Sequence, residues 1–314
     1  MAERISRTLD LGTREVVREY RSTSGTLDLG RREMSRADSF QSEMEQTRTT
    51  IQAHPFSSRR WNYQRSEAEE RMAARRLVER VEFTGDMATA VAKSKSEVQK
   101  VRSDDGELNI YKPTRGERLD GVESYYAKMG AQTAREIAAY RLDEMLGFGR
   151  IPPTARTAGM IGRDGTPSGP GMVQQFVEST QSLDLRWYPR VQRQQMAVLD
   201  YIMGAEDRHY GNFRTVTSGG QHNIVAVDHG RSFPSTKSPF GVPILSDFVA
   251  EQIGGKEPLD PSVLAAVKAV DPGKLTEALG DAGLDPSAIR GALARLAKLK
   301  ELGDIPKNTL LVDD

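Results

Sequence analysis

The chain contains no cysteine and carries no net charge, because its 44 lysine and arginine residues balance 44 acidic ones. Without cysteine there is no disulfide framework, no thiol chemistry and no cysteine-based zinc site. Without net charge, no global field attracts nucleic acid or an anionic membrane. We therefore expect no nucleic-acid partner.

The sequence also lacks the long apolar runs that membrane insertion needs. No run reaches the roughly 18 residues of a transmembrane helix, and residues 1–12 lack the apolar core of a secretory signal. The histidines show no metal-site spacing such as H-E-x-x-H; they are His54, His209, His222 and His229. These absences favour a cytoplasmic protein, although an effector injected without a signal peptide would look the same.

The stretch from Gly204 to Pro234 concentrates the polar residues that suit a catalytic site. Its first part is a short loop, a turn follows at 218–220, and an apolar run at 224–227 ends in a carboxylate. This order predicts a hairpin that brings two polar groups side by side. Those groups are Asp207, Arg208, His209 and Asn212 in the first loop, and Asp228 and His229 after the second strand.

These residue types fit phosphoryl transfer from ATP. Its transition state carries negative charge on the phosphoryl oxygens, so catalysis is mostly positioning plus cations. Mg²⁺ prefers oxygen ligands, and Asn212 and Asp228 supply an amide and a carboxylate. Asp207 and His209 are left to orient and deprotonate the acceptor hydroxyl.

The pattern D-R-H-x-x-N followed by D-x-G resembles the catalytic and metal-binding motifs of the phosphoinositide 3- and 4-kinase-like superfamily. The sequence departs from it at His229, where the superfamily usually has phenylalanine. The run YKPxRGE, REIAAYRL, PPT, GMVQ, DR and DHG, over about 95–240, also resembles small actinobacterial proteins of that superfamily. The resemblance implies a two-lobed protein-kinase-like α+β fold that uses ATP with Mg²⁺ or Mn²⁺.

Residues 98–101 and 108–111 are predicted strands, joined by a hairpin turn at 103–106. The second strand leads into Lys112, and a kinase uses a strand lysine to hold the α/β-phosphates. Periodicity predicts a helix at 131–146. Within it, Glu136 is expected to pair with Lys112, or else to be a helix-start glutamate favoured by the helix dipole.

The chain has no G-x-G-x-x-G loop of the protein-kinase type. Instead, Ser94 and Ser96, in a loop at 90–96, could cradle phosphates; a solvated turn is an equal alternative. Residues 171–177 read as a buried strand leaving the first lobe. By resemblance to the superfamily's hinge, Gln174 and Phe176 would offer backbone groups to adenine. After Ile151-Pro-Pro-Thr154, the segment GRDGTPSGPG at 162–171 reads as a turn or loop.

Several helices are predicted for the second lobe. The helix at 190–204 delivers the catalytic loop, in which Arg208 is expected to brace the backbone rather than touch substrate. The last helix has a clear start, because Asp285 can cap it and Pro286 suits its first position. The other predicted helices lie at 244–253, 261–270, 273–282 and 286–302.

Residues 1–75 differ from the rest and are read as an extension, partly disordered or regulatory. Their cationic residues are all arginine, and the sequence TLDLGxRE occurs at 8–15 and again at 26–33. Such a tandem copy could dock a partner, or be a chance duplication in a disordered tail. A helix at 66–80 that braces the catalytic unit is predicted from Ser66 and Glu69, a capping-box pair.

The expected arrangement is a small β-rich lobe at 76–176 and a mainly helical lobe at 177–314. The expected function is ATP- and Mg²⁺-dependent phosphorylation of a hydroxyl, with a protein Ser/Thr first, since Lys237 is the lone cation of the predicted substrate loop. The alternatives are a phosphoinositide or small-molecule kinase, an AMP transferase, and a non-catalytic nucleotide-binding scaffold.

Overall fold

The computed structural model describes residues 61–118, 130–162, 167–236, 238–240, 242–255 and 257–309. The chain divides into two compact units, residues 1–58 and 59–314, and all described residues belong to the second. The repeated TLDLGxRE and most of the predicted extension lie outside the described residues. Their docking role stays a prediction.

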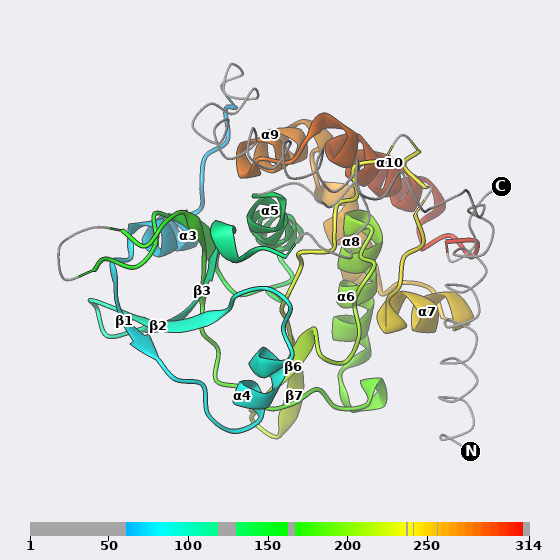
Figure 1. Cartoon of the computed structure of the whole chain (residues 1–314). Helices are drawn as coiled ribbons and strands as arrows, with labels where there is room; N and C mark the ends of the chain where they lie inside the picture. Colours follow the sequence, from blue (N-terminus) through cyan, green and yellow to red (C-terminus); the bar gives the residue numbers. More distant parts are fainter. Residues whose placement is uncertain are drawn as a thin grey trace, which may run out of the picture. The chain divides into compact units, whose positions relative to one another are not determined.

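The first lobe is built on an antiparallel sheet with the strand order β1-β2-β3-β5-β4. Helix α3 (Glu67–Ala74) covers one face of it (Figure 1). The strands are β1 (Leu77–Val81), β2 (Gln99–Ser103), β3 (Leu108–Pro113), β4 (Thr154–Thr157) and β5 (Gly171–Gln175). A separate small core fills the space beneath α3, formed by Met72, Leu77, Val101, Tyr111, Ala155 and Val173.

Alternation along β3 decides which side chains face the second lobe. Tyr111 is fully buried in the small core, whereas Ile110 and Lys112 are partly exposed. Because successive side chains of a strand point to opposite faces, Ile110 and Lys112 share the face turned away from α3. Both of them line a cleft between the lobes.

The second lobe is mainly helical and has its own, larger core. Its elements are α6 (Arg190–Met203), the hairpin β6 (Phe213–Ser218) and β7 (Gln221–Ala226), α7 (Asp247–Gly254), α8 (Pro261–Ala269), α9 (Pro272–Ala282) and α10 (Pro286–Leu302). Short 3₁₀ turns lie at Thr114–Gly116 and Leu185–Trp187. Asp285 caps α10 as predicted, accepting hydrogen bonds from the N–H groups of Ser287 and Ala288.

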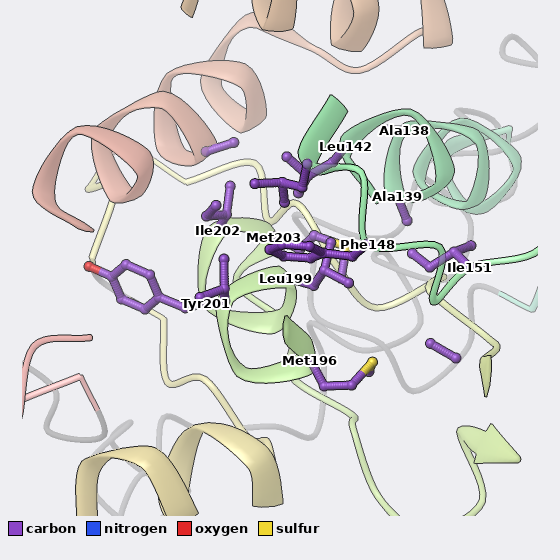
Figure 2. Packing of buried hydrophobic residues seen from close by; sticks show 14 of the residues in the cluster. Ala138, Ala139, Leu142, Phe148, Ile151, Met196, Leu199, Tyr201, Ile202 and Met203 are labelled. Carbon is purple, nitrogen blue, oxygen red and sulfur yellow. The ribbon is translucent and has the colours of Figure 1, made fainter. Parts of the chain in front are cut away.

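Helix α5 (Ala131–Leu146) joins the two lobes. Its buried side chains Ala138, Ala139 and Leu142 share one cluster with Leu199, Ile202 and Met203 of α6 (Figure 2). Twelve of its sixteen residues are buried, so its position is fixed by packing on all sides. The α+β fold with a β-rich first lobe and a helical second lobe is the one that the sequence predicts.

Three local features of the first lobe differ from the prediction. The helix expected at 66–80 ends at Ala74, and Leu77–Val81 pair with β2 as strand β1, because burying Leu77 in the small core outweighs local helix propensity. Strand β4, paired with β5, was not predicted. The loop expected at 90–96 begins inside a helix, α4 (Gly85–Ala92).

None of the helices among the described residues is both long and apolar enough to cross a bilayer. Only one of the two hydrogen bonds of the predicted capping box forms. Ser66 Oγ accepts a hydrogen bond from the N–H of Glu69, and the Glu69 carboxylate turns to the guanidinium of Arg141, 2.7 Å away. Both partners of this ion pair are buried, which ties α3 to α5 and fits the brace expected for this segment.

Candidate active site

A cleft of about 850 Å³ separates the sheet of the first lobe from the hairpin of the second. Of the predicted site residues, Glu136 alone does not line it. The others are gathered on its walls: Ser94, Ser96, Lys112, Gln174, Phe176, Asp207, His209, Asn212 and Asp228.

Lys112 connects the two lobes at one end of the cleft. Its ammonium nitrogen lies 2.6 Å from Glu136 Oε1 and 3.1 Å from Asp228 Oδ1. Burial alone would lower the pKa of Lys112, but the carboxylates of Asp228 and Glu136 raise it above its ordinary value. Lys112 therefore stays a cation, and the ion pair with Glu136 expected from the sequence is present.

Glu136 is almost fully buried yet remains charged. Burial would raise its pKa, but Lys112 and His229 together hold that pKa well below its usual range. Its second oxygen, Oε2, accepts hydrogen bonds from the backbone N–H of His229 and from the ring Nδ1, each at 3.1 Å. Because burial lowers the pKa of His229, the ring is neutral and its proton lies on Nδ1.

Arg208 braces the loop between α6 and β6, as predicted. Its buried guanidinium pairs with Asp200 of α6 at 3.0 Å and donates to the backbone carbonyls of Asn212, at 2.5 Å, and Val227, at 2.8 Å. Since Asn212 precedes β6 and Val227 follows β7, one side chain fixes both ends of the hairpin. The N–H of Val227 also donates to the Asn212 carbonyl.

Asp207 and His209 lie side by side on the wall of the cleft. His209 Nε2 lies 3.7 Å from Asp207 Oδ1, while its Nδ1 accepts a hydrogen bond from the N–H of Gly211. A neutral ring that accepts at Nδ1 carries its proton on Nε2, so Nε2 is a donor in this arrangement. Burial raises the pKa of Asp207 above its ordinary value, leaving its carboxylate as the proton acceptor of the pair.

Asn212 and Asp228 suit a divalent cation that arrives with a nucleotide. Asn212 Nδ2 donates to the Asp207 carbonyl at 2.6 Å, which leaves its Oδ1 available as a ligand. Asp228 has a φ of 57°, an unusual backbone conformation for a residue other than glycine. Its carboxylate is half exposed in the cleft. Two protein oxygens are too few for Mg²⁺, which commonly completes its shell with phosphate oxygens and water.

No group of three or more His, Cys, Asp or Glu side chains that could hold a metal ion exists among the described residues. The side chains that could contribute ligands to a metal ion here are Asn212 and Asp228, and such an ion would need further ligands from a bound molecule or water.

The structure corrects which residue of the predicted hinge has a free backbone N–H. Gln174 is paired with Ile110 on one side and Thr154 on the other, so its backbone lies inside the sheet. The N–H of Phe176 donates to the Leu108 carbonyl at 3.1 Å and is not free for a ligand. The next residue, Val177, lines the cleft, and its N–H donates to no other residue in the described part of the chain.

Ser94 and Ser96 lie in a tight turn at the mouth of the cleft. Ser94 Oγ donates to the carbonyl of Ser96, and Ser96 Oγ donates to Gln132 Oε1 of α5. Further residues that line the cleft were not predicted from the sequence. They include Arg231, and also Asp86 and Arg214, which form an ion pair. Arg231 follows Asp228 by three positions, and this spacing is the signal that could have identified it.

Residues 134–254 match the family model of phosphatidylinositol 3- and 4-kinase. The chain is 28% identical over 193 residues to phosphatidylinositol 4-kinase gamma 3 of Arabidopsis thaliana, covering 52% of this chain and 32% of that protein. It is 31% identical over 120 residues to phosphatidylinositol 4-kinase gamma 4 of Oryza sativa subsp. japonica, covering 34% and 21%. The chain thus spans a third or less of these relatives.

Among solved structures, the Golgi casein kinase with Mn/ADP bound is 13% identical, with a TM-score of 0.48, and covers 89% of this chain and 90% of that one. A Helicobacter pylori proinflammatory kinase, CtkA, is 11% identical, with a TM-score of 0.41, and covers 73% and 93%. Over residues 134–254, the chain is similar to the phosphatidylinositol 3- and 4-kinase family, which its motifs also resemble.

Proposed function

We propose that the protein transfers the γ-phosphoryl group of ATP to a hydroxyl acceptor in the presence of Mg²⁺ or Mn²⁺. The observation that carries this proposal is the position of Lys112, whose ammonium reaches Glu136 of α5 and Asp228 of the hairpin at once. A cation fixed in this way beside a metal-binding carboxylate is what phosphate binding requires.

The nucleotide would lie with its base between the two lobes. Ile110 of β3 and Val98, just before β2, supply apolar side chains from the first lobe, and Val225 of β7 and Val227, just after it, supply them from the second. The N–H of Val177 would serve as the hydrogen-bond donor at the hinge. The triphosphate would then extend toward Lys112 and the turn that holds Ser94 and Ser96, where hydroxyl and backbone donors can bind oxygens.

Asn212 and Asp228 would hold the divalent cation, which neutralises charge on the phosphates when bound. Asp207 would accept the proton of the acceptor hydroxyl, because it is the carboxylate at the open side of the loop. His209, with its proton on Nε2, would donate to Asp207 or to the acceptor and orient them. Arg208 would keep the loop in register with Asp228 without touching substrate.

For the acceptor we favour the side chain of a protein Ser or Thr. A phosphoinositide is the second candidate, because the two curated relatives are named phosphatidylinositol 4-kinases. Fold and motif leave this choice to experiment, since one site geometry serves both acceptors. A small-molecule acceptor, transfer of AMP and a non-catalytic scaffold are further outcomes of the same test.

The test uses the full chain with ATP labelled in the γ-phosphate, Mg²⁺, and either protein extract or vesicles that contain phosphatidylinositol. We expect label in protein, and none with Asp207→Ala. Mass spectrometry of the product distinguishes an added phosphoryl group from an added AMP. The proposal is wrong if wild type transfers no label to any acceptor and turns over no ATP, or if Asp207→Ala transfers as much label as wild type.

A further inference from the structure

Helix α4 (Gly85–Ala92) is an isolated element between β1 and β2. None of its eight residues is buried, although the helix includes the apolar side chains Met87 and Val91. An isolated helix of two turns is marginal in water, and helices in proteins gain most of their stability from packing. Since α4 buries no side chain, its position must depend on something other than core packing.

That support comes from the opposite lobe. Asp86 Oδ2, in the first turn of α4, lies 2.7 Å from an Nη atom of Arg214 on strand β6. Figure 1 shows α4 beside the β6–β7 hairpin, although the sheet that flanks α4 in sequence belongs to the first lobe. The ion pair therefore joins the two lobes between two residues that line the cleft.

Arg214 is well placed to be the fixed half of this pair. Its side chain is 8% exposed, and the guanidinium also donates to the carbonyl and the hydroxyl of Ser179. The Asp86 carboxylate is 31% exposed. A rigid, nearly buried cation thus holds a more exposed carboxylate that sits on a weakly packed helix.

The helix lies against the part of the cleft assigned to the nucleotide. Asp86, Met87, Ala90 and Val91 line its wall, directly before the turn that carries Ser94 and Ser96. In this chain α4 lies in the connection between β1 and β2. Segments of low local stability are the ones that open and close over binding sites.

We propose that α4 is a lid over the nucleotide part of the cleft, and that Asp86 and Arg214 form the latch that closes it. The identity of the ligand beneath the lid rests on the proposed function. The latch does not depend on the proposed function, because it is a contact between two side chains of the structure. With the latch broken, α4 would open more often, and a nucleotide would both enter and leave faster.

The latch is tested by hydrogen exchange on the full-length protein without ligand. We expect the backbone amides of α4 to exchange several-fold faster in Asp86→Ala than in wild type, with unchanged exchange in β3 and α5. The matched control is Glu79→Ala, which removes a surface ion pair with Arg102 in the same lobe but away from the cleft. Unchanged exchange of α4 in Asp86→Ala would overturn the latch.

The lid is tested by stopped-flow binding of Mg²⁺ with a fluorescent methylanthraniloyl-ATP. In Asp86→Ala we expect the dissociation rate to rise by about five- to tenfold, as opening of a lid sets the release rate. The charge swap Asp86→Arg with Arg214→Asp should return the rate toward wild type.

Equal dissociation rates in wild type and Asp86→Ala would overturn the lid. Failure of wild type to bind the nucleotide would overturn it too, together with the proposed nucleotide site, whereas loss of phosphoryl transfer alone would refute only the proposed function.

Discussion

The ring Nδ1 of His229 lies 3.1 Å from Glu136 Oε2, which ties the loop that carries Asp228 to helix α5. The other oxygen of the same carboxylate holds Lys112 at 2.6 Å. One buried glutamate thus sets the relative positions of Lys112 and the loop that carries Asp228. Phenylalanine, the residue usual here in the superfamily, could fill the space but could not donate this hydrogen bond.

Replacing His229 by phenylalanine should therefore weaken catalysis more than folding. We expect kcat/KM for ATP to fall about tenfold, equivalent to about 1.4 kcal/mol of transition-state stabilisation, because Glu136 loses one of the donors that orient it. The measurement is steady-state phosphoryl transfer at varied ATP, with the melting temperature recorded for each variant.

The variant His229→Asn is the matched control, since its amide N–H can take the place of the ring Nδ1–H. It should recover most of the activity that His229→Phe loses. A phenylalanine variant with wild-type kcat/KM, or an asparagine variant as impaired as it, would contradict a positioning role for the ring.

The grouping of the candidate residues around one cleft was easier to predict from the sequence than the strands of the first lobe. The hairpin motif lies within one short stretch, where local order alone brings Asn212 next to Val227, the residue between β7 and Asp228. Helix α10 was also predictable, because its cap and its apolar periodicity are local signals. Such signals depend on residues close in sequence and little on contacts with distant ones.

Strands β1 and β4 and the lid helix α4 could not be predicted in the same way. Leu77 sits in a sequence of good helix formers, and only its burial among Met72, Tyr111 and Val173 makes the strand favourable. Likewise, the Phe176 N–H looked available until its partner Leu108, 68 positions away, was placed beside it. Long-range contacts of this kind leave no pattern in a single sequence.

Removing the charge of Arg208 should destabilise the protein strongly. Its partner Asp200 is fully buried and would keep only a hydrogen bond from Ser246 Oγ. Breaking a buried pair from one side commonly costs about 3–5 kcal/mol, so Arg208→Met should lower the free energy of unfolding in urea by that amount. The double variant Arg208→Met with Asp200→Asn should recover part of it. A single variant within about 1 kcal/mol of wild type would contradict the brace.

A methyl group at Gly211 should disturb His209 and leave the fold intact. A Cβ there would lie 2.7 Å from His209 Cε1 and 2.9 Å from Nδ1, so the ring would have to rotate and lose its bond to the Gly211 N–H. Because correctly placed acid–base groups contribute roughly 10²–10⁴-fold to rate, Gly211→Ala should reduce kcat markedly while KM for ATP stays constant.

Gly254→Ala is the control for Gly211→Ala, since a Cβ there would meet nothing within 4 Å. Equal kcat in both variants would remove His209 from the mechanism.

Asp143 should make the stability of the protein depend on pH. Burial raises the pKa of this carboxyl, near the end of α5, to about 7, against about 3.9 in an unfolded chain. The folded state thus binds the proton more tightly, so this stabilisation is complete below about pH 4 and is lost as pH rises toward 7. At 1.36 kcal/mol per pKa unit, the loss amounts to at most about 4 kcal/mol.

The substitution Asp143→Asn isolates this titration, because an amide does not ionise in this pH range. The amide oxygen can still accept the bond from the Ile151 N–H, which Oδ2 of the carboxyl accepts at 2.9 Å in wild type. The free energy of unfolding of Asp143→Asn relative to wild type should therefore rise between pH 5 and pH 8, measured in urea at both values. Asp184→Asn, at a half-exposed carboxylate, is the control. A difference between Asp143→Asn and wild type that is the same at both pH values would show that Asp143 is not held protonated by its burial.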